Sequence, residues 1–142
     1  MPIVRRHVYV EQSASRMFDL VNSISAYQQW FRWCAASQVI SATDQQIVAR
    51  LDIRLGAFKT WFTTTNDLER PTRIRLTLCD GPFRQLEGEW RFDPIAENRC
   101  KVSLSLEFEP ATSLFAPIVN LGLQGLIDRM VHDFIEVAQR ET

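Results

Sequence analysis

Long apolar runs are missing from this sequence. No stretch reaches the about 18 uninterrupted apolar residues that a membrane-spanning helix usually needs. The first residues, Met1 to Arg6, also lack the apolar run and the small-residue cleavage site of a secretory signal peptide. We therefore expect a cytoplasmic protein.

Cysteine and histidine are scarce. The three cysteines, Cys34, Cys79 and Cys100, do not have zinc-site spacing, and their odd number does not suggest a disulfide framework. None has a local cationic setting that would lower its thiol pKa. His7 and His132 fall on the polar sides of an expected strand and an expected helix, so nothing places them together as a dyad. We expect no metal site and no required cofactor.

An excess of charge of either sign is also absent. The chain has 16 basic and 17 acidic residues, for a net charge of −1. This balance argues against a bulk electrostatic grip on nucleic acid, and we expect no DNA partner. Glu87 and Glu89 share one strand face, but we interpret them as outward-pointing residues of a solvated surface. The sequence therefore gives no constellation for catalysis, and we expect a protein that is not an enzyme.

The chain is about one domain long, at 142 residues, and no linker, repeat or low-complexity tract divides it. We expect a single domain over residues 1–142. Alternation of apolar and polar residues dominates, which predicts antiparallel strands with one wet face. The expected strands are Ile3–Val10, Gln38–Thr43, Gln46–Leu55, Phe58–Leu68, Arg73–Cys79, Arg84–Phe92 and Arg99–Glu109.

Two helical segments accompany the strands. Ser13 is a suitable N-cap for a short amphipathic helix over Ala14–Ile24. A long helix is expected over Thr112–Arg140, with Pro117 near its first turn. Its apolar residues recur at spacings of three and four, a pattern that predicts a core stripe. The stripe consists of Val119, Leu123, Leu126, Met130, Phe134 and Val137.

The first part of this long helix, from Leu114 to Gly125, is apolar nearly all round. We expect a ligand or a membrane beside it. Gly122 and Gly125 lie in the helix interior, where each costs about 1 kcal/mol relative to alanine. Either the helix approaches the sheet closely there, or the glycines leave room for a ligand.

The strand Phe58–Leu68 places polar residues where its neighbours carry aliphatic ones. If Phe62, Thr64 and Asn66 point toward the helix, the two polar side chains could bind a ligand oxygen. In the opposite orientation, Trp61 lies inside and they are wet. The sequence leaves both orientations open.

The segment from Tyr27 to Trp33 concentrates aromatic residues. Tyr27, Trp30, Phe31 and Trp33 could form a lid over a cavity, contact a membrane surface, or plug the open end of the sheet.

A second feature is a group of basic residues on outward positions of strands that are expected to be neighbours. This basic patch consists of Arg50, Arg54, Lys59, Arg73 and Arg75. We interpret it either as a solvated face or as a docking patch for ribosomal RNA.

The stretch from Asp80 to Phe92 carries the pattern D-G-P-F-x-x-L-x-G-x-W-x-F. In this pattern, and upstream at Tyr27, Trp33 and Cys34, the chain resembles the coenzyme Q-binding START-domain family, which includes bacterial ribosome-association toxins. The resemblance spans essentially the whole chain. It implies an α+β helix-grip fold, with a curved, seven-stranded antiparallel sheet wrapped around the C-terminal helix and an apolar tunnel between them.

The resemblance also implies a function. We expect non-enzymatic binding of ubiquinone or an isoprenoid lipid, in support of respiratory electron transport, with peripheral contact at the inner membrane. The first alternative is a toxin that binds a ribosomal subunit and blocks subunit joining; the second is a cyclase or dehydratase. The expected cavity residues are Phe62, Thr64, Asn66, Phe83, Leu86, Trp90, Val119, Leu123, Leu126 and Met130.

Overall fold

The structure, a computed structural model, describes residues 2–140. Seven strands form one antiparallel sheet in the order β1-β7-β6-β5-β4-β3-β2, so β2 to β7 form a meander and β1 joins it beside β7. The strands are β1 (Ile3–Val10), β2 (Cys34–Ala42), β3 (Gln46–Leu55), β4 (Phe58–Glu69), β5 (Arg73–Asp80), β6 (Phe83–Ala96) and β7 (Arg99–Pro110). The predicted α+β class is confirmed.

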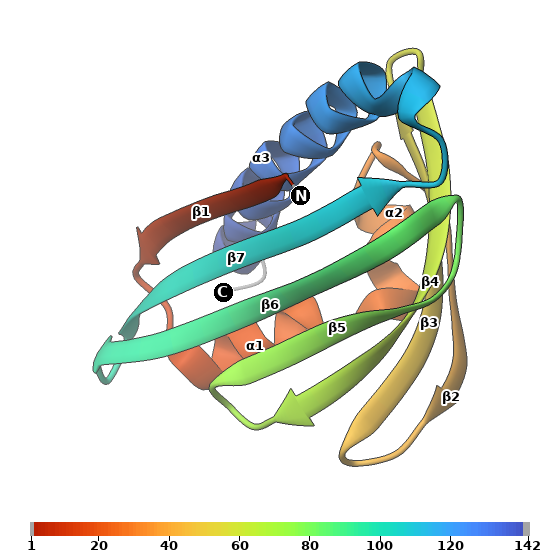
Figure 1. Cartoon of the computed structure of the whole chain (residues 1–142). Helices are drawn as coiled ribbons and strands as arrows, with labels where there is room; N and C mark the ends of the chain where they lie inside the picture. Colours follow the sequence, from red (N-terminus) through yellow and green to blue (C-terminus); the bar gives the residue numbers. More distant parts are fainter. Residues whose placement is uncertain (1, 141–142) are drawn as a thin grey trace.

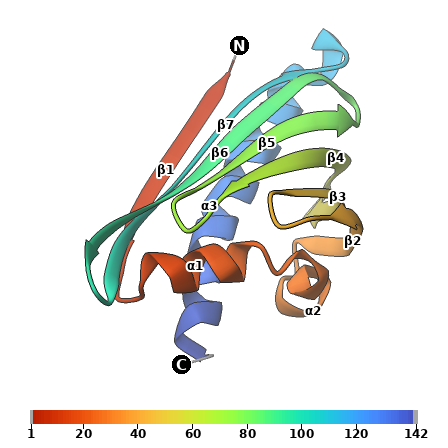
Figure 2. The same cartoon turned by 90° about the horizontal axis from the view of Figure 1, so that it is seen from below.

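The helices lie on one side of this curved sheet. Between β1 and β2 come α1 (Ala14–Val21), the 3₁₀ turn η1 (Ile24–Ala26) and α2 (Tyr27–Trp30). After β7 come the 3₁₀ turn η2 (Ser113–Phe115) and the long helix α3 (Ala116–Arg140). The sheet wraps around α3, while α1 and α2 lie at one end of it (Figures 1 and 2). The predicted helix-grip arrangement is confirmed.

Most element boundaries fall close to the predicted ones, and the exceptions have physical reasons. The first helix stops at Val21 instead of Ile24, because the chain turns into η1 and α2. Its predicted cap is present, since the Arg16 backbone N–H donates to Ser13 Oγ at 3.1 Å. Strand β6 runs through Pro94, next to a register shift at the end of the β6–β7 hairpin, where a missing N–H is tolerated.

The core lies between α3 and the concave face of the sheet. The predicted stripe of α3 is buried from Leu123 onward, whereas Val119 is only partly buried. The sheet contributes large buried side chains, among them Trp90, Phe92 and Phe108. None of the helices within residues 2–140 combines the length and hydropathy that a membrane crossing requires.

Candidate functional site

A small cavity of about 60 Å³ lies inside the grip of the sheet on α3. Aliphatic and aromatic side chains from β3 to β7 make up most of its wall, and Leu126, Ile127 and Met130 of α3 close it. A space of this size holds a few water molecules, whereas pockets for drug-sized ligands usually measure about 300 Å³ or more. The cavity is therefore smaller than a usual ligand pocket.

Polar groups gather among the residues that line this cavity. Thr64 and Asn66 of β4 both line it and are buried, and Thr64 Oγ1 donates a hydrogen bond to Asn66 Oδ1 at 2.6 Å. Asn22, at the end of α1, also lines the cavity. Its side-chain oxygen and nitrogen are both buried, and neither has a partner within the described residues. Since a buried amide without hydrogen bonds costs about 1–3 kcal/mol, Asn22 is suited to hold a polar group of a ligand.

The orientation of β4 follows from the same side chains. Phe62, Thr64 and Asn66 face inward, so the first of the two orientations left open by the sequence is correct. Trp61 lies on the outer face, where the Arg50 guanidinium stands 4.2 Å from the centre of its ring. The polar residues of this strand thus lie inside the grip, although their role toward a ligand stays a prediction.

The other predicted cavity residues divide between two spaces. Those that line the cavity are Phe62, Thr64, Asn66, Leu86, Trp90, Leu126 and Met130. Leu123 is fully buried but does not line it. Phe83 and Val119 line a separate groove of about 440 Å³, between the β3–β4 hairpin, the β5–β6 turn and the start of α3. The residues that the sequence predicted to form one site thus divide between two neighbouring spaces, the cavity and the groove.

A pair of rings stands between the cavity and this groove. Phe62 lines the cavity and Phe83 lines the groove, and their centroids are 6.4 Å apart in an edge-to-face arrangement. The contact between these two rings is thus the boundary between the cavity and the groove.

The interior glycines of α3 mark a close approach of the helix to the sheet. A Cβ atom on Gly122 would lie 2.5 Å from carbon atoms of the Phe58 ring, and one on Gly125 would lie 3.3 Å from Leu55 Cδ2. The ring of Phe58 therefore fills the space that a side chain at position 122 would need. Close approach, the first of the two explanations from the sequence, accounts for Gly122.

The aromatic segment is part of the core. Tyr27, Phe31 and Trp33 are almost fully buried, and Phe31 stacks on Trp33 with centroids 4.8 Å apart. Phe134 of α3 packs edge-to-face on both Phe31 and Tyr27. The Trp33 indole N–H donates to Asp133 Oδ2 at 3.0 Å. The burial of these three rings fits the last of the three alternatives from the sequence, a plug at one end of the sheet, whereas contact of the segment with a membrane surface stays a prediction.

Trp30 completes this segment as its least buried aromatic residue. Its ring packs edge-to-face on Phe31, with centroids 5.9 Å apart.

Tyr27 lines the cavity, and its hydroxyl donates to the backbone carbonyl of Val21. Burial raises the pKa of Tyr27 far above its usual value, so this hydroxyl stays protonated. Tyr27 therefore adds no charge to the cavity wall.

The predicted basic patch is largely neutralised by neighbouring acids. Its strands are adjacent, as predicted, but Arg50 pairs with Asp52 at 3.0 Å, and Arg73 pairs with Glu69 and Glu89. Arg75 lies opposite Asp67 on β4 and Glu89 on β6. Arg54 and Lys59, which face each other across β3 and β4, make no ion pair within residues 2–140. Among the described residues of the predicted patch, Arg50 and Arg73 are thus ion-paired, whereas Arg54, Lys59 and Arg75 are not.

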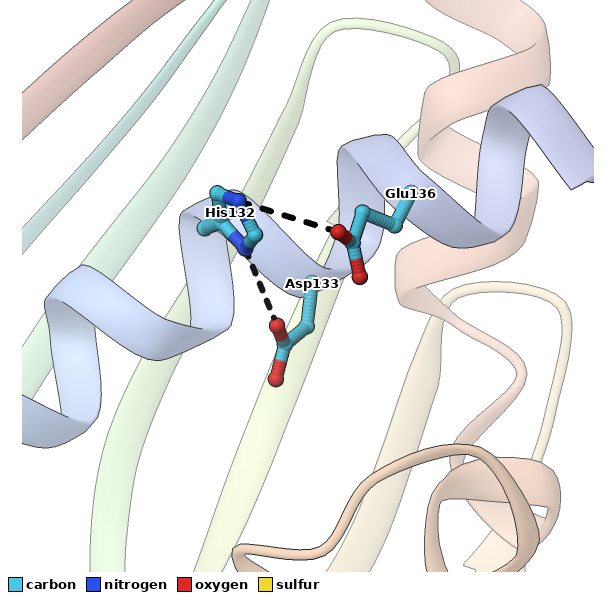
Figure 3. Close-up of side chains that lie close together, drawn as sticks. All are labelled: His132, Asp133 and Glu136. Carbon is cyan, nitrogen blue, oxygen red and sulfur yellow. Dashed lines mark hydrogen bonds and ion pairs between the residues drawn. The ribbon is translucent and has the colours of Figure 1, made fainter.

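Within residues 2–140, the two histidines do not lie together. His7 and His132 lie on β1 and α3, on different elements. His132 Nδ1 is 3.2 Å from Asp133 Oδ1 and His132 Nε2 is 3.8 Å from Glu136 Oε1 (Figure 3). The ligand atoms of these three residues lie within 4.8 Å of one another, but His132 and Glu136 are exposed, and such surface clusters are common without a metal ion.

Two of the three thiols are buried. Burial raises the pKa of Cys34 and of Cys100 to about 11, so both remain neutral and unreactive at ordinary pH. Cys79 is exposed, and its sulfur lies 2.9 Å from Thr65 Oγ1. These positions agree with the prediction that the thiols do not act as nucleophiles.

Asn22 is the residue of the cavity that sequence reasoning missed. An asparagine after a short helix is an ordinary C-terminal residue, so its type and position carry no signal of a binding role. Only the packing of α1 across the end of the sheet brings its amide to the cavity. The aliphatic residues Leu104, Leu106 and Ile127 also line the cavity and were not assigned to it from the sequence.

Comparison with known proteins places these features in a wider group. The profile of the family described as "Polyketide cyclase / dehydrase and lipid transport" matches residues 10–135. The ribosome association toxin RatA of Escherichia coli K12 is 32% identical over 94% of this chain and 85% of its own length. RatA of Vibrio cholerae is 34% identical over 99% of this chain and 97% of its own length.

A more distant relative is the mitochondrial coenzyme Q-binding protein COQ10 of Drosophila melanogaster. It is 24% identical over 94% of this chain, which spans 57% of that protein. Among solved structures, a START superfamily protein from Mycobacterium smegmatis matches with a TM-score of 0.84 and 19% identity, covering 99% of both chains. The Zhui aromatase/cyclase from Streptomyces matches with a TM-score of 0.81 and 16% identity, covering 98% of this chain and 94% of the other. At these identities the likeness shows a shared fold.

Proposed function

The chain belongs to the polyketide cyclase / dehydrase and lipid transport family, and on that premise we propose that it binds a hydrophobic small molecule without transforming it. The ligand lies between α3 and the sheet, with a polar end at Asn22, Thr64 and Asn66. The observation that carries this proposal is the buried amide of Asn22, which has no partner within the described residues and lines an otherwise apolar cavity.

The chemistry of the lining favours a quinone or a related isoprenoid lipid. A quinone carbonyl accepts a hydrogen bond from an asparagine amide, and an isoprenoid tail suits aliphatic walls such as Leu86, Leu104 and Leu126. Ubiquinone is the specific candidate, because one relative is named for binding coenzyme Q. In this role the protein would support respiratory electron transport.

Binding requires the cavity to open. The volume of about 60 Å³ is too small for a substituted quinone ring, since usual ligand pockets begin at about 300 Å³. The groove beyond Phe62 and Phe83 supplies the missing space when these rings rotate. The proposed site is therefore the cavity and the groove together.

Catalysis is not part of this proposal. Of the described residues that line the cavity, Tyr27 alone is titratable, and its hydroxyl already donates to Val21. General acid–base chemistry needs a group whose pKa lies near the working pH, whereas burial moves the pKa of Tyr27 away from it. This chain thus shares the scaffold of the aromatase/cyclase, but no described residue that lines its cavity is placed to act as the acid or base.

A test of the proposal fills the cavity from its wall. Ala49 is buried on β3 and lines the cavity, so Ala49→Leu should occupy the space without disturbing the outer face. We expect the wild-type protein to bind a short-chain ubiquinone, followed by quenching of tryptophan fluorescence, and Ala49→Leu to bind it roughly tenfold or more weakly. Ala42→Leu, on an exposed position of β2, is the matched control.

A second variant tests the polar end separately. Asn22→Leu removes the unpartnered amide, so it should stabilise the free protein by about 1 kcal/mol while weakening quinone binding. Equal quinone affinity of the wild type, Ala49→Leu and Asn22→Leu would contradict the proposal. So would extraction and mass spectrometry that find neither a copurified lipid nor uptake of added quinone.

The second candidate function is docking on a ribosomal subunit. It is favoured by relatives of 32–34% identity that are named ribosome association toxins and align with 94–99% of the chain. The outer face offers Trp61 beside Arg50, and Arg54 on the same strand as Arg50. If this surface binds ribosomal RNA, the protein should shift the subunit profile in sucrose gradients, and Arg54→Glu with Trp61→Ala should remove the shift.

A further inference from the structure

Three large aliphatic side chains protrude from the start of the last helix. Leu114, Ile118 and Leu121 are 79%, 60% and 71% exposed. Their spacing of four and three residues places them on one side of the η2–α3 segment. We call these three residues the aliphatic ridge. The remaining exposed large hydrophobic residues of the described chain, Ile3, Tyr9, Ile40 and Ile95, are scattered over β1, β2 and β6.

The aliphatic ridge borders the groove that leads toward the cavity. Ile118 is part of both, because it also lines the groove together with Phe58, Phe83 and Val119. The start of α3 lies at the same end of the molecule as the β3–β4 hairpin (Figure 1). This end therefore combines a protruding apolar ridge with an apolar opening, a surface that scattered apolar residues do not form.

Basic side chains lie beside this apolar surface. Lys59 lines the groove, and Arg54 is its cross-strand neighbour on β3. Neither forms an ion pair with another residue in the described part of the chain. Arg84, next to Phe83, pairs with Glu109 at 3.8 Å, and Asp80 accepts a hydrogen bond from the Gly81 N–H. Among the described residues that line the groove, Lys59 is the charged one, and Arg54 stands beside it on β3.

We propose that this end of the molecule docks on an anionic lipid bilayer, with the aliphatic ridge in the acyl boundary and Arg54 and Lys59 at the headgroups. A bilayer surface offers an apolar layer and an anionic layer within about 5–10 Å of each other, the same combination that this surface presents. The groove then faces the bilayer, and a lipid reaches the cavity without crossing water. Membrane contact thus lies at the opposite end of α3 from the buried aromatic segment.

The test measures binding to vesicles. Flotation of the wild-type protein with vesicles of phosphatidylcholine and phosphatidylglycerol should show binding that weakens in pure phosphatidylcholine and at high salt, because exposed charges are screened. A triple variant should bind vesicles roughly tenfold or more weakly, since each of its substitutions removes an inserted aliphatic group. It carries Leu114→Gln, Ile118→Gln and Leu121→Gln. The exposure of all three positions keeps these variants folded.

A control is Ile95→Gln, which changes an aliphatic residue that is 51% exposed and lies at the end of β6. The hairpin between β6 and β7 lies at the far end of the sheet from the start of α3 (Figure 1). The Ile95→Gln variant should bind vesicles like the wild type. A fluorophore that reports polarity, attached at Leu121→Cys in a Cys79→Ser background, should shift to the blue with vesicles, and the same label at Ile95→Cys should not. This shift separates insertion from adsorption.

Three outcomes overturn the proposal: no flotation of the wild type, unchanged binding of the triple variant, or a fluorophore at position 121 that stays in water. Dimerisation that the triple variant abolishes, without vesicle binding, would assign the ridge to a second copy of the chain. The result is independent of the proposed ligand function, because Ala49→Leu, which fills the cavity, should still bind vesicles. Loss of quinone binding alone leaves the docking proposal intact.

Discussion

The two halves of α3 differ in what they contact. From residue 126 to 140 the helix packs into the aromatic cluster of Tyr27, Phe31, Trp33 and Trp90 through Phe134. From residue 116 to 125 it carries two glycines, borders an open groove and exposes Ile118 and Leu121. The buried residues of the helix begin only at Leu123.

The two halves of α3 therefore differ in how easily they can open. Burial of large rings concentrates the favourable free energy at the C-terminal half. The N-terminal half forms fewer buried contacts, and regions of that kind open at lower free-energy cost than the core does. The groove borders this N-terminal half, whereas Leu126, Ile127 and Met130 of the packed half close the cavity. A ligand of the proposed kind would thus enter at the half that opens easily and be held against the half that does not.

The largest expected effect tests the packed half. Phe134→Ala removes a ring that touches three other aromatic residues, so we expect the free energy of unfolding to fall by about 3–5 kcal/mol. Urea unfolding followed by circular dichroism measures this loss. Ile118→Ala in the other half should change stability by no more than about 0.5 kcal/mol. Similar losses for the two variants would remove the contrast between the halves.

The two glycines sharpen the comparison within the N-terminal half. Gly122→Ala should destabilise by about 1 kcal/mol or more, because overpacking against the Phe58 ring exceeds the gain in helix propensity. Gly125→Ala should be neutral or stabilising by up to about 1 kcal/mol, since Leu55 Cδ2 can move. Thermal unfolding of both variants distinguishes these signs.

Phe58→Leu provides the control for this pair. In that background Gly122→Ala should become less costly, because the smaller side chain leaves room for a methyl group. A stabilising Gly122→Ala in the wild-type background would show that Phe58 moves freely. The close approach would then not explain the glycine.

The smallest expected effect is a pH dependence from the buried thiols, neither of which lines the groove. The pKa of a cysteine thiol in the unfolded chain is about 8.5. In the fold, the pKa of Cys34 and of Cys100 is raised to about 11. Because the folded pKa is the higher one, this contribution is complete below the unfolded pKa and is lost as the pH rises toward 11. We expect a loss on the order of 1 kcal/mol for each thiol.

Urea unfolding at neutral and at alkaline pH measures this effect. Cys34→Ala and Cys100→Ala should each flatten the fall in stability between the two conditions. Cys79→Ala is the control and should leave the slope unchanged, because Cys79 is exposed. An unchanged slope in all three variants would assign the alkaline loss to other groups.

Much of the fold follows from local patterns in the sequence. Period-two alternation located the strands to within a few residues, because one face of the sheet is buried and the other is wet. The stripe along α3 was also predictable from its spacing. The start of β2 at Cys34 was not, because the strand emerges directly from a packed aromatic segment whose residues show no alternation.

The candidate site was less predictable than the fold. The positions of Thr64 and Asn66 became clear only once β4 was fixed between β3 and β5, since either face of that strand was compatible with its sequence. Asn22 reaches the cavity through the packing of α1, a tertiary feature that no local pattern encodes. The ion pairs of the basic residues were also not predicted: Arg73 pairs with Glu69 of β4 and Glu89 of β6, which become its neighbours only through strand pairing.

The pairing of β1 with β7 has a consequence for the order of folding events. Ile3 lies opposite Glu107, whereas β2 to β7 pair with their nearest neighbours along the chain. The meander can form from short-range hairpins, but β1 stays without a partner until β7 exists, and such distant pairings slow folding. During synthesis β1 is therefore an uncovered strand edge for most of the time, and we expect this segment to depend most on chaperones.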